Sequence, residues 1–412
     1  MSVDHRRAGG QPHPVYDYPD PYFRMVPQDR GVRRGSREPR RRWALRAAIA
    51  GFALLGLFTS ASVVGALSTP GNANFNAKWA DWLRGHHAGI VVNPLERWYY
   101  SSQAPAPGGH PRALNAVPHP ANLHAPAGSA HHLAAPPPVP LVVSPGLPGE
   151  GQWQPTGPLL TGHPGMFVAQ YRADTLYTSQ ITTAVWIDPT SLRVQLVPGS
   201  QEPGGAWSQP PDIAGAAAAH AIAAFNGGFR FADAQGGFSL DGRTAIPLRP
   251  GAASVVLYKD GRINVGGWGT EVTMGPDVEA VLQNLVPLVD NGHIAPDATY
   301  RDARIWGATL GSSTVVARSG VGVTANGALV YVAGPALTAK TLAESLQRAG
   351  AVRAMTLDIN PEWVTFNLFN HPNPADRSQI NAVKLYPQMQ RAATRFLGPA
   401  PEDRDFFTVS TP

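Results

Sequence analysis

The sequence predicts an α+β fold in which mixed β-sheets pack with a few helices. From Trp153 onward, short runs rich in Val, Ile and Tyr are typical of strands, and Asp-Gly or Asn-Gly turns separate them. Helical patterns are fewer and do not alternate strictly with the strands, which disfavours a parallel α/β sheet. The expected strands are Thr182–Ile187, Arg193–Val197, Ala253–Tyr258, Arg262–Val265, Thr314–Val316 and Ala328–Val332. The expected helices are 212–224, 277–289 and 338–350.

The helix expected over 338–350 carries its own start and stop signals. Leu342 and Leu346 share one face, which is the spacing of a helix that packs on a core. Thr338 or Thr341 can cap its first turn, and Gly350 stands where a left-handed residue ends a helix. A buried strand then follows directly, so this unit belongs to the folded core.

The basic charge of the chain belongs to its N-terminal segment. Residues 1–46 contain 11 Arg and 5 acidic residues, a net charge of +6, whereas the remaining 22 Lys and Arg and 23 acidic residues give −1. A folded part without excess positive charge gives no reason to expect nucleic-acid binding. The chain has no Cys, which excludes disulfides and thiolate chemistry. Residues 1–42 are polar and rich in Arg and Pro, as is typical of a disordered tail.

An apolar segment follows this tail. No residue from Ala47 to Leu67 is charged, and 21 residues of helix span roughly 30 Å of hydrocarbon. We therefore expect a transmembrane helix over 43–67, with Trp43 and Arg46 at one interface. The preceding Arg cluster places the N-terminus in the cytoplasm and the rest of the chain outside. A cleaved signal peptide is the alternative, but the length of the segment and of its tail favours an uncleaved anchor.

Two further segments precede the predicted domain. In region 68–100, Phe75, Trp79, Trp82 and Leu83 form one helical stripe, which suits either the outer membrane interface or docking on the domain. Residues 101–150 are rich in Pro, Ala and His, which indicates an extended linker. The irregular spacing of its His residues favours a solvated linker over a metal site. The predicted organisation is a tail over 1–42, a membrane helix over 43–67, these two regions, a domain over 151–400 and a C-terminal tail over 401–412.

The first candidate site is the end of the strand predicted to begin at Ala351. An apolar run opens abruptly into Asp358, Asn360, Pro361 and Glu362, and Trp363 follows. A strand that ends in two carboxylates and an amide presents side chains rather than packing them. These residue types suit acid–base chemistry, and an indole face suits a sugar ring. Asp358 and Glu362 can also be a turn cap and an exposed side chain.

The second candidate site is Asn226-Gly227-Gly228, which ends another apolar run. Consecutive glycines let a ligand approach the main chain, and Arg230 close by can bind an anion. An ordinary strand-to-turn junction has the same signature. Arg318, which stands before a glycine-spaced strand, is either an anion-binding side chain or a surface charge.

Taken in order, several of these motifs resemble the phosphodiester glycosidase family. The resemblance covers residues 160–360 and rests on Phe225-Asn226-Gly227-Gly228-Phe229, Gln283–Gly292, Arg318–Gly322, Asn326-Gly327, and the Thr341–Gly350 helix leading into Leu357-Asp358. It implies an α+β fold with mixed sheets and hydrolysis of sugar-1-phosphodiesters at the sugar side. It also implies that Asn226, Gly227, Gly228, Arg318 and Asp358 line the pocket.

One loop departs from this family. The family usually continues from the Asp with Gly-Gly-Gly-Ser-Ser, whereas Asp358 is followed here by Ile359, Asn360, Pro361 and Glu362. Pro361 fixes φ and removes a backbone donor, so the loop is stiffer and offers fewer amides to a phosphate. The replacement adds a second carboxylate and the indole of Trp363.

As a hypothesis for catalysis, Asp358 acts as base or nucleophile and Glu362 is the second carboxylate. Arg318 or Arg230 neutralises the phosphate, and Asn226 binds sugar hydroxyls. Asn360 and Trp363 complete the substrate site, with Trp363 as a stacking surface. No ligand spacing supports a metal ion, a divalent cation at Asp358 included, and we expect no cofactor.

The expected function is that of a single-pass membrane protein whose main domain hydrolyses sugar-1-phosphodiester bonds in cell-envelope glycans such as polysaccharides. A non-catalytic glycan-binding protein derived from the same family is the main alternative. A scaffold whose Arg-rich tail binds a cytoplasmic partner or anionic lipids is a third. The sequence does not decide the sugar, the aglycone or the oligomeric state.

Overall fold

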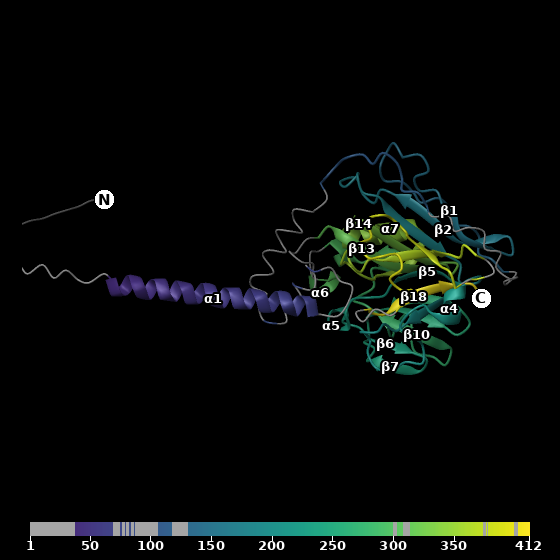
Figure 1. Ribbon diagram of the computed structural model, residues 1–412. Helices are drawn as coiled ribbons and strands as arrows, with labels where there is room; N and C mark the ends of the chain where they lie inside the picture. The colour runs from purple at the N-terminus through teal and green to yellow at the C-terminus, as the bar shows by residue number, and fades with distance from the viewer. Residues whose placement is uncertain are drawn as a thin grey trace, which may run out of the picture. The chain divides into compact units, whose positions relative to one another are not determined.

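The computed structural model describes residues 38–68, 106–117, 131–299, 303–307, 314–373, 378–398 and 403–412, together with residues 75, 79, 82, 83, 86 and 376. The chain divides into two units, residues 1–59 and 60–412, and each is described by itself. Most of helix α1 (Glu38–Ser68) belongs to the first unit, and the sheets belong to the second (Figure 1).

Helix α1 is long and apolar enough over Arg42–Ser68 to cross a membrane. Its large apolar side chains point outward: Trp43 is 71% exposed and Phe52 is 76% exposed. A continuous apolar surface of this length is costly in water and suits hydrocarbon. The helix predicted over 43–67 is therefore present, and it begins five residues earlier, inside the segment predicted to be a disordered tail.

Other predictions for the N-terminal region lie largely outside the described residues. Positions 1–37 of the predicted tail and most of the 68–100 region are not among the described residues. Phe75, Trp79, Trp82 and Leu83 are helical, and Trp79 and Trp82 pack against Leu83. This agrees with the predicted stripe, while its contact with a membrane stays a prediction.

The largest sheet is eight-stranded, with the order β1-β2-β3-β14-β13-β15-β11-β12. All its ladders are antiparallel. Its strands are β1 (Gln154–Leu160), β2 (His163–Tyr171), β3 (Thr182–Ile187), β11 (Val289–Asp290), β12 (His293–Ile294), β13 (Val316–Thr324), β14 (Leu329–Leu337) and β15 (Ala351–Thr356).

Two five-stranded antiparallel sheets complete the described part of the domain. One has the order β7-β6-β10-β8-β9 and the other β17-β16-β5-β18-β4. The first contains β6 (Phe238–Leu240), β7 (Arg243–Ile246), β8 (Ala253–Tyr258), β9 (Ile263–Gly267) and β10 (Val278–Gln283). The second contains β4 (Arg193–Val197), β5 (Ala221–Asn226), β16 (Phe366–Asn370), β17 (Asn381–Lys384) and β18 (Phe406–Ser410). Figure 1 shows β5 and β18 between the strands of the other two sheets.

The main core lies where the three sheets face one another. Phe225 of β5 is fully buried, and its ring lies 5.2 Å from that of Tyr331, 5.5 Å from that of Phe366 and 5.0 Å from that of Phe407. These four rings come from four strands, so aromatic packing joins the sheet of β5 to the eight-stranded sheet. The predicted α+β class with few helices is confirmed.

Helix α7 (Ala339–Arg348) covers the opposite face of the eight-stranded sheet, where Leu342 and Leu346 are fully buried. Both predicted cap residues take part in its start. The Thr341 amide donates to Thr338 Oγ1 at 3.0 Å, and the Thr338 amide donates to Thr341 Oγ1 at 2.8 Å. This reciprocal pair satisfies two backbone donors at the helix start.

Thr338→Ala is expected to destabilise the full-length chain by about 1 kcal/mol, because the Thr341 amide loses its acceptor. Chemical denaturation followed by tryptophan fluorescence measures the change. Thr338→Ser keeps the hydroxyl and is expected to retain most of the stability. Equal losses for Ala and Ser would show that the cap does not cause the effect.

Of the three predicted helices, the one over 277–289 was wrong and the one over 212–224 was right only in part. Residues 277–289 contain strand β10, which pairs with β6 and β8 and is buried on both faces except at Glu279. A strand buried on both faces lacks alternation, so its pattern resembles a buried helix. In 212–224, only Gly215–His220 is helical (α4), and β5 follows. Pairing of β5 with β16 and β18 outweighs the helix preference of its alanines.

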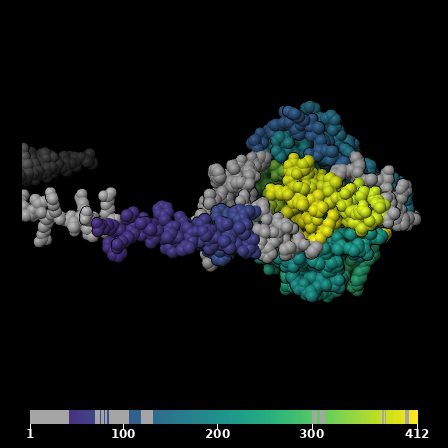
Figure 2. Space-filling model, in the orientation of Figure 1, coloured from purple at the N-terminus to yellow at the C-terminus, as the bar shows by residue number. Residues whose placement is uncertain are grey.

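Both predicted edges of the domain need correction. The C-terminal end does not fray: Phe406–Ser410 forms β18, which lies between β5 and β4. Figure 2 shows the part of the chain near the yellow, C-terminal end of the colour bar lying between blue and teal parts of the domain. Within the predicted linker, Glu150 is buried and pairs with Arg172 at 2.8 Å. The folded domain therefore extends beyond its predicted bounds, 151–400, at both ends.

Candidate active site

Asp358 lies two residues beyond the end of β15, and its side chain is held by several donors. Its carboxylate accepts from the amides of Ile359 at 2.7 Å and Asn360 at 2.8 Å, and from Arg404 Nη2 at 2.6 Å. Its own amide donates to Ser319 Oγ at 3.2 Å. Burial raises the pKa of Asp358, while Arg404 and the two amides offset part of that rise. The result is a carboxylate of fixed orientation in a dry environment.

Arg404 joins Asp358 to an aromatic and cationic cluster. Its guanidinium lies 3.8 Å from the centre of the Trp363 ring, and that of Arg395 lies 4.1 Å away. Arg395 pairs with Asp403 at 2.9 Å. The indole is 8% exposed, so it packs against guanidinium groups instead of offering an open face to a sugar. Its predicted role as a stacking surface therefore needs a rearrangement of these arginines.

Glu362, the second predicted catalytic carboxylate, contacts arginine side chains. The carboxylate of Glu362 lies 3.7 Å from Arg391 Nη2, and its backbone carbonyl accepts from Arg391 and Arg395. Asn360 is exposed and uses its side-chain oxygen to accept from the Glu362 amide at 3.0 Å. The loop after Asp358 is thus a hydrogen-bonded turn that directs Glu362 toward Arg391.

Asn226 ends β5 and is 4% exposed. Its amide nitrogen donates to Ser319 Oγ at 3.1 Å, and its oxygen accepts from Tyr331 at 3.1 Å and from the Thr365 amide at 3.1 Å. Since Ser319 Oγ also accepts from the Asp358 amide, one hydroxyl connects the two sequence motifs. Asn226 therefore links the end of β5 to β13, to β14 and to the residue before β16.

The two glycines after Asn226 are required by close packing. A Cβ on Gly227 would lie 1.9 Å from Asp405 Oδ2, and one on Gly228 would lie 3.3 Å from Asn284 Cβ. The Gly227 amide also donates to the Asp405 carbonyl at 3.1 Å. Neither glycine has a positive φ. These positions therefore require glycine because there is no room for a side chain, and not because of an unusual backbone angle.

Asp405 is the acidic residue that the sequence analysis missed. It is 3% exposed, and neither of its carboxylate oxygens has a hydrogen-bond partner among the described residues. Burial raises the pKa of Asp405 to about 7, against partial lowering by Arg404. A buried, unpaired carboxyl that changes protonation near neutral pH is suited to proton transfer. The sequence signal was the alternation Asp403-Arg404-Asp405 before an apolar run, which was interpreted as part of a tail.

Arg318 and Arg230, the two predicted phosphate-binding arginines, differ in their surroundings. Arg318 is 4% exposed and donates to the carbonyls of Leu337 at 2.9 Å, Trp306 at 3.4 Å and Thr314 at 3.4 Å. Burial lowers its pKa to about 10. Arg230 is exposed at the start of the short helix α5 (Phe231–Ala234). The cationic partner of Asp358 is Arg404.

The described residues contain no group of three or more His, Asp or Glu side chains arranged to hold a metal ion. They do contain two buried carboxyl groups that Arg404 influences: Asp358 is hydrogen-bonded to Arg404, and Asp405 is its neighbour in the chain. Paired carboxyl groups with different surroundings can divide the roles of base and acid.

Comparison with known proteins assigns a family to this part of the chain. Residues 219–360 match the sequence model of the phosphodiester glycosidase family. That segment contains Asn226, Gly227, Gly228, Arg318 and Asp358, but it ends before Arg404 and Asp405. No curated protein sequence matches the chain.

Two solved structures share weak similarity with the chain. The catalytic domain of zebrafish N-acetylglucosamine-1-phosphodiester alpha-N-acetylglucosaminidase, described as auto-inhibited by its pro-peptide, has 15% identity and a TM-score of 0.38, covering 60% of this chain and 82% of its own. A hypothetical protein from Synechocystis has 14% identity and a TM-score of 0.34, covering 63% and 64%. The similarity to the phosphodiester glycosidase family therefore rests on the family model, which matches residues 219–360 of this chain.

Proposed function

We propose that this domain hydrolyses the glycosyl bond of sugar-1-phosphodiesters. The observation that carries the proposal is the pairing of Asp358, from the segment that matches the family, with Arg404, which precedes β18 and is followed by the buried Asp405. Similarity to the family supports the reaction type, and the two carboxyl groups with one guanidinium supply the groups that such a reaction uses.

In the proposed reaction, Asp358 takes a proton from water as the water oxygen forms a bond to the anomeric carbon. The bond between that carbon and the phosphate oxygen breaks, and its electron pair leaves with the phosphate. Asp405 donates a proton to the departing oxygen, which a raised pKa favours. Arg404, which pairs with Asp358, stabilises negative charge on the leaving phosphate. Asn226 and Ser319 position Asp358.

We further propose that the substrate is a glycan of the cell envelope and that the domain works outside the cytoplasm. Helix α1 supports anchoring in a membrane, since it is apolar over Arg42–Ser68. The Arg cluster at 40–42 precedes this segment, and positive charge favours the cytoplasmic side. Accessible substrates would then be polysaccharides or lipid-linked sugars at the outer surface.

A non-catalytic glycan-binding protein is the second candidate. The carboxylate of Asp358 is already satisfied by two amides and Arg404, and the guanidinium groups cover the Trp363 ring. A site so fully bonded favours a structural role for Asp358 unless substrate displaces Arg404. The loop that departs from the family's glycine-rich sequence is consistent with this alternative.

A turnover assay separates the two candidates. The full-length chain, in a detergent without a sugar headgroup, is incubated with N-acetylglucosamine-1-phosphodiesters, and released reducing sugar is measured by mass spectrometry. We expect release from these substrates, but none from a methyl glycoside of the same sugar or from a sugar-free aryl phosphodiester. Absence of release across a panel of sugar-1-phosphodiesters, from protein shown to be folded, would favour the binding protein.

A further inference from the structure

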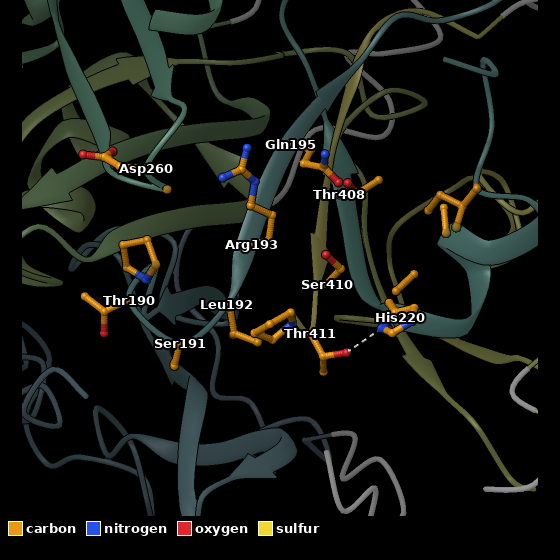
Figure 3. Close-up of a pocket in the computed structure, with 16 residues that line it drawn as sticks. Thr190, Ser191, Leu192, Arg193, Gln195, His220, Asp260, Thr408, Ser410 and Thr411 are labelled. Atoms are coloured by element: carbon orange, nitrogen blue, oxygen red, sulfur yellow. Dashed lines mark hydrogen bonds between the residues drawn. The ribbon is translucent and has the colours of Figure 1, made fainter. Parts of the chain in front are cut away.

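One cavity of the domain does not include Asp358, Arg404 or Asp405 among its lining residues and has no role in the proposed reaction. It has a volume of about 470 Å³, within the range of ligand pockets. Figure 3 shows it on the strands β4 and β18, beside the end of helix α4. We name it the β4–β18 pocket. The polar residues that line it are Thr190, Ser191, Arg193, Gln195, His220, Asp260, Thr408, Ser410 and Thr411.

The polar wall of this pocket follows from strand alternation. Ser410 of β18 stands opposite Arg193 of β4, and Thr408 stands opposite Gln195. These four side chains share one face of the sheet, while Phe407 and its alternating neighbours enter the main core on the other face. Residues that stand opposite each other on the two strands lie about 5 Å apart, and residues i and i+2 of one strand, which point to the same face, lie about 7 Å apart. The wall is therefore a regular array of hydroxyl, amide and guanidinium groups.

The charged groups of the pocket are already paired. Arg193 forms an ion pair with Glu279, and Asp260 pairs with Arg262 at 2.6 Å. His220 lies 3.3 Å from the Thr411 hydroxyl (Figure 3). Because no excess charge of either sign faces the cavity from these residues, a strongly ionic ligand gains little there. Hydroxyl and amide groups beside apolar walls from Leu192, Ile213 and Ala217 suit a neutral polyhydroxylated molecule.

The pocket and the candidate active site are at opposite ends of the same strands. Ala221 lines the pocket at the start of β5, and Asn226 contacts the Asp358 network at its end. Five residues of strand separate them, roughly 17 Å. In β18, Ser410 lies in the pocket, and Asp405 precedes the first residue of the strand. One sugar ring cannot occupy both sites.

We propose that the β4–β18 pocket binds a neutral sugar unit, as a carbohydrate site separate from the catalytic one. Thr408, Ser410 and Gln195 supply hydrogen bonds to sugar hydroxyls, and Ala217 and Leu192 contact the apolar face of the ring. This inference does not depend on hydrolysis, so it holds for a glycosidase and for a glycan-binding protein alike.

Ligand-observed NMR and calorimetry of the full-length chain, in a detergent without a sugar headgroup, test this proposal. The probes are glucose and N-acetylglucosamine, titrated through the millimolar range. We expect saturable binding of at least one of them. The double variant Thr408→Val/Ser410→Ala removes two hydroxyl groups, and we expect it to weaken binding roughly tenfold or more.

Two further variants and one control make the outcome decisive. Ala217 is exposed on α4, so Ala217→Phe fills the pocket without disturbing the core and is expected to abolish binding. Thr244→Val, on an exposed position of β7, is the matched control and should bind as the wild type does. Asp358→Asn should also bind normally. The proposal is overturned if neither sugar binds saturably, or if binding survives Ala217→Phe and is lost in Asp358→Asn.

Discussion

Asp358→Asn is expected to lower the turnover of sugar-1-phosphodiesters by roughly 10²–10⁴-fold, the usual contribution of a positioned acid or base. The substitution keeps the shape of the side chain and its ability to accept from the Ile359 and Asn360 amides. It removes the negative charge that pairs with Arg404 and that would take a proton from water. The loss should therefore appear in kcat, with the fold retained.

Asp241→Asn is the matched control for this experiment. Asp241 is exposed, has φ of 50° and precedes Gly242 in the turn between β6 and β7. Asn tolerates that conformation and makes an equally good turn with Gly. The control should keep full turnover. Full turnover in Asp358→Asn itself would remove Asp358 from the chemistry and reduce it to a structural residue.

Asp405→Asn is expected to stabilise the protein above neutral pH. In the folded chain the pKa of Asp405 is about 7, whereas the ordinary value of 3.8 applies to the unfolded chain. The unfolded state therefore loses its proton first, and folding becomes less favourable as pH rises from about 4 to about 7. Three units of pKa difference correspond to a penalty on the order of 4 kcal/mol at pH 8. A neutral Asn does not pay this penalty.

Urea denaturation at pH 4.5 and pH 8 measures this effect. Asp405→Asn and the wild type should have similar stability at the lower pH, and the variant should be clearly more stable at the higher one. The same variant should have lower turnover, because it cannot donate a proton to the departing phosphate. Parallel pH dependence in the two proteins would show that Asp405 ionises normally and is not the proposed acid.

Much of the fold could be predicted from local sequence signals. β3, β4 and β8 have the bounds that their Val- and Ile-rich runs indicated, and α7 has the capping threonines that its first turn required. The failures are strands buried on both faces. β5 and β10 lack polar alternation, so only their pairing with distant strands decides between helix and strand.

The candidate site was only partly predictable for a similar reason. Asn226 and Asp358 stand at the ends of apolar runs, where a change from packing to polar residues is visible in the sequence. Arg404 and Asp405 precede a strand that lies between β5 and β4, and its partners are about 180 to 210 residues earlier in the chain. Nothing local in Asp403-Arg404-Asp405 indicates that such a long-range pairing buries it.

The position of bond cleavage tests the central claim most directly. The full-length chain is incubated with an N-acetylglucosamine-1-phosphodiester in ¹⁸O-labelled water, and the released phosphate monoester is examined by mass spectrometry. Attack at the anomeric carbon leaves the phosphate oxygens unchanged, so the account predicts a monoester without label and free N-acetylglucosamine as the other product. Label in the phosphate would mean cleavage of the phosphorus–oxygen bond and would contradict the glycosidase mechanism.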